Sequence, residues 1–126
     1  MTNFLTTDLA LRLHDIALER HGGMAGLRDR GAFESAIAQP EATFGGDLLH
    51  PGIFEQAAAY LFHLAKNHAF LDGNKRVALA CATVFLEMNG YELPAEANDA
   101  LERLTLAVAE GRADKATIAQ EFASYF

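Results

Sequence analysis

The chain has 126 residues, enough for one domain with its own hydrophobic core and too few for two. Asp and Glu outnumber Lys and Arg by 17 to 10, and the resulting net charge of -7 argues against direct binding of nucleic acid, because an acidic surface repels a phosphate backbone. The single cysteine fits a reducing compartment, and no apolar run has the length of a membrane span or a signal peptide, so we expect a soluble, cytoplasmic protein that does not engage a membrane.

The N-terminal residues predict a helix followed by a glycine-rich turn. Apolar residues recur at helical spacing as far as Ala17, with Thr6 or Thr7 as the N-cap and Gly22 as the stop. Residues 21–28 contain three glycines, and we interpret them as a tight turn that sets the angle between two helices.

A second and a third helix are expected on either side of an irregular segment. Asp29 could cap a short helix that ends before Pro40. Residues 41–52, with a double glycine and Pro51, predict an irregular loop or a short flap. The helical pattern resumes at Ile53. On its polar side we place Gln56, Ala59, His63 and Lys66.

The run from Asn74 to Asn89 predicts the central helix of the fold. It is apolar nearly all round, which is typical of a buried helix, and Gly90 is a suitable C′ residue. Two further helices follow, one ending at Gly111 and one passing through Tyr125. The predicted fold class is all-α: a single domain over residues 1–126, with five or six helices packed as a compact bundle around a buried central helix.

The residues at the start of the predicted central helix, around Gly73, favour an anionic ligand. A helix N-terminus has unpaired backbone N–H groups and partial positive charge. Gly73 would let the backbone approach a phosphate closely, and Lys75 and Arg76 add two positive charges. This is not the common P-loop, because Gly-x-x-x-x-Gly-Lys-Ser/Thr does not occur.

Two further side chains of this segment suggest chemistry. Asp72 is its only carboxylate and could anchor magnesium, which takes one or two carboxylates together with phosphate oxygens. His68 lies just upstream, at the end of the preceding helix, and its imidazole could accept a proton from an attacking hydroxyl. Taken singly, each residue has a structural explanation as a turn, a helix cap or a solvated charge. The combination of base, carboxylate, glycine and two cations favours a catalytic site over these structural explanations.

The segment His68-x-Phe70-x-Asp72-Gly73-Asn74-Lys75-Arg76 resembles the signature of the Fic/Doc superfamily, and specifically that of the Doc toxins. A second match lies in the N-terminal third. It consists of Leu13-His14, Gly22-Gly23, Gly26, Arg28-Asp29, Gly31, Glu34-Ser35-Ala36, Pro40 and Phe44. The resemblance therefore covers nearly the whole chain.

The resemblance implies an all-helical Fic-type fold and transfer of part of ATP to a protein hydroxyl. His68 would be the base, Asp72 would hold magnesium and Phe70 would pack inward. The residues implied to cradle phosphates are Gly73, Asn74, Lys75 and Arg76. Doc toxins phosphorylate a threonine of elongation factor Tu and stall translation, so a translation factor is the implied substrate. The implied inhibitor is an antitoxin whose disordered tail folds into a groove.

Three departures separate the chain from the commoner Fic pattern, His-Pro-Phe-x-x-Gly-Asn-Gly-Arg-x-x-Arg, which transfers adenylate. Ala69 replaces the proline, Lys75 the second glycine and Leu79 the last arginine. They favour γ-phosphate transfer, with adenylate transfer as the alternative. The self-inhibitory Fic pattern is also absent, because Thr105 and Glu110 are one residue too far apart, which favours an external inhibitor.

Other interpretations compete with this one. His14-Asp15 is similar to the paired ligands of HD-type phosphohydrolases, but no histidine precedes it, so we expect a structural His14 late in the first helix. We expect Cys81 to be an inert core thiol, and His50 and His63 show no evident partners. A different class of function is a non-catalytic module that binds an antitoxin-repressor and tunes its affinity for DNA.

Overall fold

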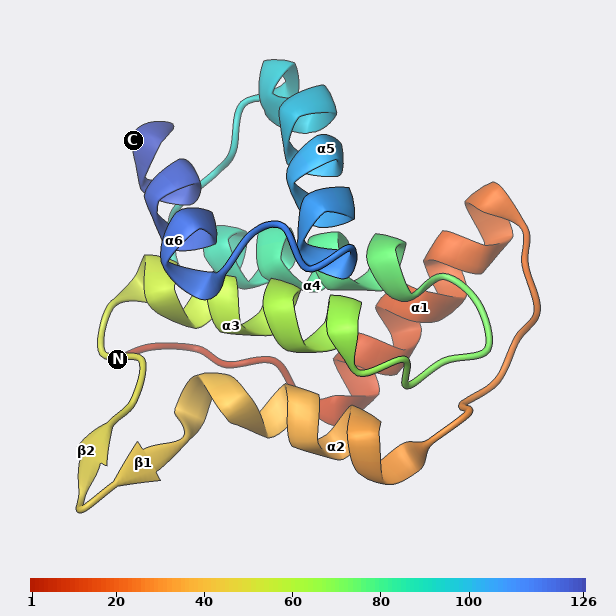
Figure 1. Cartoon of the computed structure of the whole chain (residues 1–126), viewed down its shortest axis with the longest axis horizontal. Coiled ribbons are helices and arrows are strands. Elements are labelled where there is room, and N and C mark those ends of the chain that lie inside the picture. Colours follow the sequence, from red (N-terminus) through yellow and green to blue (C-terminus); the bar gives the residue numbers. More distant parts are fainter.

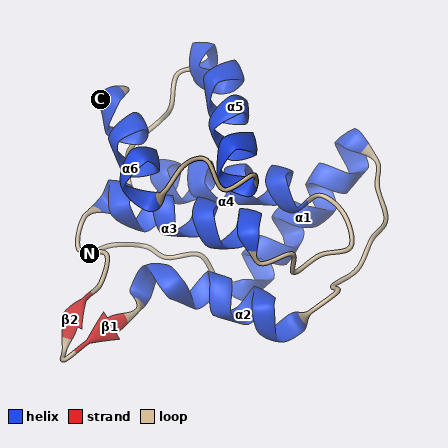
Figure 2. Cartoon of the chain, viewed as in Figure 1, coloured by secondary structure: helices blue, strands red, loops and turns tan.

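The computed structural model describes all residues, 1–126, and confirms the all-α fold class (Figure 1, Figure 2). The six helices are α1 (Thr7–His21), α2 (Arg30–Ala38), α3 (Ile53–Lys66), α4 (Asn74–Met88), α5 (Asn98–Ala109) and α6 (Lys115–Ser124). Short 3-10 turns occupy Gln39–Glu41 and Ala95–Ala97, and a hairpin pairs β1 (Thr43–Phe44) with β2 (Asp47–Leu48). No helix is both long and apolar enough to span a bilayer.

The predicted helix ends are confirmed where a capping residue sets them. The Thr6 hydroxyl accepts a hydrogen bond from the Leu9 amide at 3.1 Å and starts α1. The Asp29 carboxylate accepts a hydrogen bond from the Ala32 amide at 3.0 Å and starts α2. After α4, Gly90 adopts a φ of 90° and closes a Schellman motif, in which its amide bonds to the Glu87 carbonyl at 3.1 Å.

The centre of the bundle is a pair of helices rather than α4 alone. In Figure 1, α3 and α4 lie side by side through the middle of the molecule, and they form its most extensive helix–helix contact. Residues 56–61 of α3 are all buried, including Gln56 and Ala59, which we had placed on a polar side. That placement was wrong because α2, α5 and α6 cover the other faces of α3.

The segment 41–52 was predicted as an irregular loop or a short flap, and the structure shows the second alternative, a short hairpin. Gly45 and Gly46 have φ angles of 60° and 89°, the left-handed conformation that both residues of a type I′ turn require. The double glycine therefore makes a two-residue hairpin, in which Phe44 pairs with Asp47. In Figure 1 this hairpin projects from the end of the molecule opposite the loop between α3 and α4.

Candidate functional site

Two segments distant in sequence form the site. The signature loop, residues 67–73, joins α3 to α4, and the glycine-rich segment, residues 22–29, runs beside it. The amides of Arg28 and Asp29 donate to the Ala69 carbonyl at 2.8 and 3.0 Å, and the Leu71 amide donates to the Gly26 carbonyl at 3.1 Å. Our interpretation of residues 21–28 as a tight turn was therefore wrong: His21 ends α1, and the segment that follows runs along the signature loop and is hydrogen-bonded to it.

Phe70 anchors the signature loop to the core, as the resemblance implied. Its side chain is buried, stacks on His14 with ring centroids 3.7 Å apart, and meets Phe33 edge-on at 5.4 Å. The Asn74 side chain locks the backbone of the same residue, since its Oδ1 accepts from the Phe70 amide and its Nδ2 donates to the Phe70 carbonyl, both at 3.0 Å. This leaves the backbone N–H of Asn74, and not its side chain, for a phosphate.

The N-terminus of α4 is open. No side chain caps it, and the helical ladder begins with the Val77 amide, which donates to the Gly73 carbonyl at 2.9 Å. The amides of residues 74–76 thus lack helical partners, as an anion site requires. Gly73 has a φ of 79°, and a Cβ there would lie 3.3 Å from His14 Nε2, so the local packing demands glycine independently of any ligand.

Both cations that follow are available to a ligand. Lys75 and Arg76 are exposed on the first turn of α4, and neither takes part in a salt bridge. They are thus the free positive charges beside the open helix start, on a protein whose net charge is negative.

Asp72 is exposed but already engaged. Its Oδ2 accepts a hydrogen bond from the Met24 amide at 2.7 Å, which ties the glycine-rich segment to the signature loop. A carboxylate can accept about four hydrogen bonds, so lone pairs remain for a cation. No cluster of three or more His, Cys, Asp or Glu side chains is present to hold a metal, so a magnesium ion here would need the phosphate oxygens of a nucleotide as further ligands.

His68 extends from the signature loop into solvent. It follows the C-cap residue of α3, Asn67, and lies beyond the helix end. Its φ of 50° makes it the only residue other than glycine in the left-handed region. The ring is exposed and has no hydrogen-bond partner within the chain, so a substrate hydroxyl could approach it.

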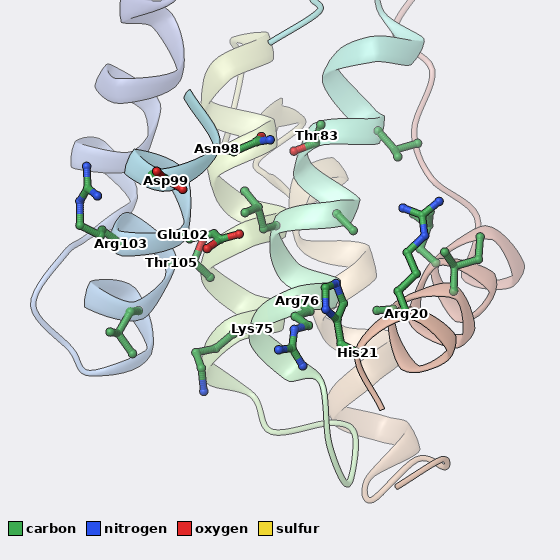
Figure 3. Close-up of a pocket in the computed structure, with 17 residues that line it drawn as sticks. Arg20, His21, Lys75, Arg76, Thr83, Asn98, Asp99, Glu102, Arg103 and Thr105 are labelled. Atoms are coloured by element: carbon green, nitrogen blue, oxygen red, sulfur yellow. The ribbon is translucent and has the colours of Figure 1, made fainter. Parts of the chain in front are cut away.

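A groove of about 1050 Å³ leads away from the two cations (Figure 3). It runs between α1, α4 and α5, and Lys75 and Arg76 line it together with Arg20 and His21 of α1. Its apolar lining consists of Leu13, Ile16, Ala17, Leu79, Ala80, Val84 and Leu106. On the α5 side, Asp99 and Glu102 supply negative charge and Arg103 supplies positive charge.

Three further histidines and the cysteine contact other parts of the fold. His14 is buried in the middle of α1, and its Nε2 lies 2.7 Å from the Asp72 carbonyl, so it is not a metal ligand paired with the exposed Asp15. No partners for His50 and His63 are evident in the sequence, but both rings contact Lys115 of α6. Cys81 is a core thiol as predicted, and burial raises its pKa to about 12.

The comparisons with known proteins agree with this architecture. Residues 4–86 match the model of the Fic/DOC family, and the chain therefore belongs to that family. It is 40% identical over 126 residues to a protein of Mycolicibacterium smegmatis named Toxin Doc, covering 99% of this chain and 95% of that protein. It is also 37% identical over 83 residues to the protein kinase doc of Escherichia phage P1, covering 66% of this chain and 65% of that protein. These relatives group it with the toxins of the Doc type.

Proposed function

We propose that the protein is the toxin of a toxin–antitoxin pair, and that it moves the γ-phosphate of ATP to a hydroxyl of a translation factor in the cytoplasm. A threonine of elongation factor Tu is the proposed acceptor. The observation that carries the proposal is the uncapped start of α4, with Lys75 and Arg76 free beside it and His68 and Asp72 on the preceding loop. The names of the two relatives, a toxin and a protein kinase, support the same proposal.

The residues divide the reaction between them. The exposed His68 imidazole takes the proton of the acceptor hydroxyl as its oxygen attacks the γ-phosphorus; the bond from that phosphorus to the β,γ-bridging oxygen breaks, and ADP leaves. The amides at the start of α4, with Lys75 and Arg76, hold the phosphate oxygens. Asp72 would hold magnesium, which, when bound, neutralises phosphate charge.

The choice of the γ-phosphate rests on positions 75 and 79. A glycine at 75 would leave room for an α-phosphate deep against the backbone, as adenylate transfer requires. Lys75 fills that space and offers an ammonium group to a terminal phosphate. Leu79, half-buried in the groove, supplies no second cation to orient the other end of the nucleotide. The nucleotide is thus expected to bind in the reverse direction to that in adenylating relatives.

ATP labelled separately at the α and γ positions tests the assignment. We expect transfer of the γ label to the target and none of the α label. Label arriving only from the α position would replace the kinase assignment with adenylate transfer. Unchanged growth arrest by folded His68→Ala and Asp72→Ala variants would instead favour the non-catalytic module that binds a repressor.

For the partner, we propose that the groove between α1, α4 and α5 receives the antitoxin tail. Its apolar floor is flanked by cations on the side of α1 and α4 and by charges of both signs on the side of α5, which suits an amphipathic helix with charges of both signs (Figure 3). A helix seated there would also cover Lys75 and Arg76, because both line the groove. Inhibition would follow from loss of the phosphate-binding cations.

A further inference from the structure

One side chain of α1 reaches the signature loop at three neighbouring places. The His14 ring is 2% exposed and stacks on Phe70 with an interplanar angle of 17°. Its Nε2 lies 2.7 Å from the Asp72 carbonyl oxygen, and the same nitrogen is the nearest atom to a Cβ placed on Gly73. A residue 58 positions upstream of Asp72 therefore touches the segment that presents the phosphate-binding amides.

The hydrogen bond fixes the orientation of one peptide group. A carbonyl can only accept, so Nε2 carries the hydrogen and donates it to Asp72. In a planar trans peptide the C=O and the N–H point in opposite directions, and the chain has no cis peptide bonds. With the Asp72 carbonyl turned toward α1, the Gly73 N–H points away from α1. The same constraint fixes the Cα that carries the Asp72 carboxylate.

Packing alone does not account for a histidine at this position. A phenylalanine could fill the volume and stack on Phe70, whereas a buried imidazole is costly unless its polar atoms are bonded. The hydrogen bond of the ring is made to the signature loop itself. His14 thus performs a task for the loop that an apolar ring could not perform.

We propose that His14 is a positioning residue of the phosphate site, holding the Asp72–Gly73 peptide so that the Gly73 amide and the Asp72 carboxylate face a magnesium-bound nucleotide. This inference rests on the proposed function. His14 lies beneath the loop and does not touch the nucleotide. It acts through Asp72 and Gly73. Groups that support a binding site from behind commonly act in this way, and loss of such a supporting group typically costs about 10–100-fold in affinity or activity.

The test compares three variants of the full chain. His14→Phe keeps the ring and removes the donor, and His14→Gln keeps a donor near the position of Nε2. Ala10→Gly loosens α1 at a buried site one helical turn before His14. Binding of MgATP is measured by calorimetry, and amide exchange at residues 73–76 by NMR without nucleotide. For His14→Phe we expect binding weaker by about tenfold and faster exchange of the Gly73 amide. The other two should stay close to wild type in both measurements.

Three results would overturn the positioning role: wild-type binding and exchange in His14→Phe, an equal loss in His14→Gln, or an equal loss in Ala10→Gly at a matched drop in melting temperature. His14→Met, which also lacks a donor, replaces the phenylalanine variant if that does not fold. If the wild-type chain binds no MgATP, the proposed nucleotide function fails. The exchange data then decide separately, since unchanged exchange in His14→Phe overturns the positioning role and faster exchange confined to the loop supports it.

Discussion

The backbone at His68 stores a small amount of strain next to the proposed chemistry. Left-handed φ values cost most side chains about 1–2 kcal/mol, because Cβ crowds the following carbonyl. His68 adopts such a value between α3 and two buried residues, Ala69 and Phe70. While its neighbours enter the core, this turn of the chain leaves the imidazole on the surface. Strain of this kind is common where a side chain must be presented.

Replacing His68 by alanine or by glycine separates the strain from the chemistry. Both variants lack the base, so phosphate transfer should fall about 10²–10⁴-fold in each. Glycine tolerates the left-handed backbone, so the free energy of unfolding of His68→Gly should be about 0.5–1 kcal/mol higher than that of His68→Ala. Denaturant unfolding measures the difference. Equal stability would remove the strain argument, and full transfer by either variant would remove His68 as the base.

Asp72 has two tasks, and one substitution can divide them. Asp72→Asn keeps an oxygen that accepts from the Met24 amide but loses the charge that would hold magnesium. We expect Asp72→Asn to retain wild-type stability and to lose the magnesium dependence of nucleotide binding. Asp72→Ala should lose both the magnesium dependence and the hydrogen bond from the Met24 amide, and the broken hydrogen bond should lower the free energy of unfolding by about 1 kcal/mol. Titrating nucleotide with and without magnesium tests this, and an unaltered magnesium dependence in Asp72→Asn would assign the carboxylate to the loop alone.

At the scale of elements, α6 is held to α3 through a cluster of basic side chains. Lys115 Nζ, at the start of α6, lies 3.1 Å from His63 Nε2 and 3.3 Å from His50 Nε2. Burial, followed by the Lys115 charge, lowers the pKa of His63 to about 4 and lowers that of His50 as well. Both rings are therefore neutral acceptors for one ammonium group at neutral pH.

This cluster predicts acid sensitivity in a defined window. A histidine in the unfolded chain binds a proton near pH 6.5, whereas His63 in the fold binds one only near pH 4. Stability is therefore full above pH 6.5 and declines as the pH falls from 6.5 to about 4, where the loss is complete. Melting temperatures at pH 7 and pH 5, above the range in which most carboxylates titrate, should show the decline. His63→Gln should reduce it, and an identical decline in that variant would exclude this histidine as the cause.

The helices were largely predictable from sequence because their signals are local. Thr6 and Asp29 accept from amides three residues ahead, and Gly90 closes a motif within five residues. Each contact lies inside the window that a sequence pattern describes. The segment from His68 to Arg76 could likewise be singled out, since its base, carboxylate and cations are contiguous.

Contacts between distant segments could not be predicted in this way. The pairing of residues 22–29 with the signature loop, the His14 bond to Asp72 and the Lys115 contacts with two histidines each join residues forty or more positions apart. The burial of α3 on its polar-looking side depends on helices that cover it. Two adjacent glycines, in contrast, were a local hairpin signal that we interpreted as a breaker.

At the scale of the whole molecule, the proposed active site and the proposed antitoxin site share residues. Lys75 and Arg76 belong both to the start of α4 and to the lining of the groove. On a chain of net charge -7 they form, with Arg20, a local positive region that favours carboxylates on a partner. A single helix could therefore bind along the groove and exclude the nucleotide at its end.

This overlap predicts that toxicity and neutralisation can be separated by mutation. Expression of the chain alone should arrest bacterial growth, and co-expression of an antitoxin should restore it.

Leu106 lies in the groove on α5 and is 43% exposed, so a charge there is compatible with the fold but not with an apolar partner surface. Leu106→Glu should therefore still arrest growth and escape the antitoxin. Met88→Glu, at a similarly exposed position of α4 outside the groove, is the matched control and should remain neutralised. Binding of the antitoxin tail to wild type should raise the helicity of the mixture, and Leu106→Glu should abolish that gain. A Leu106→Glu chain that is neutralised as well as wild type would place the antitoxin elsewhere on the molecule.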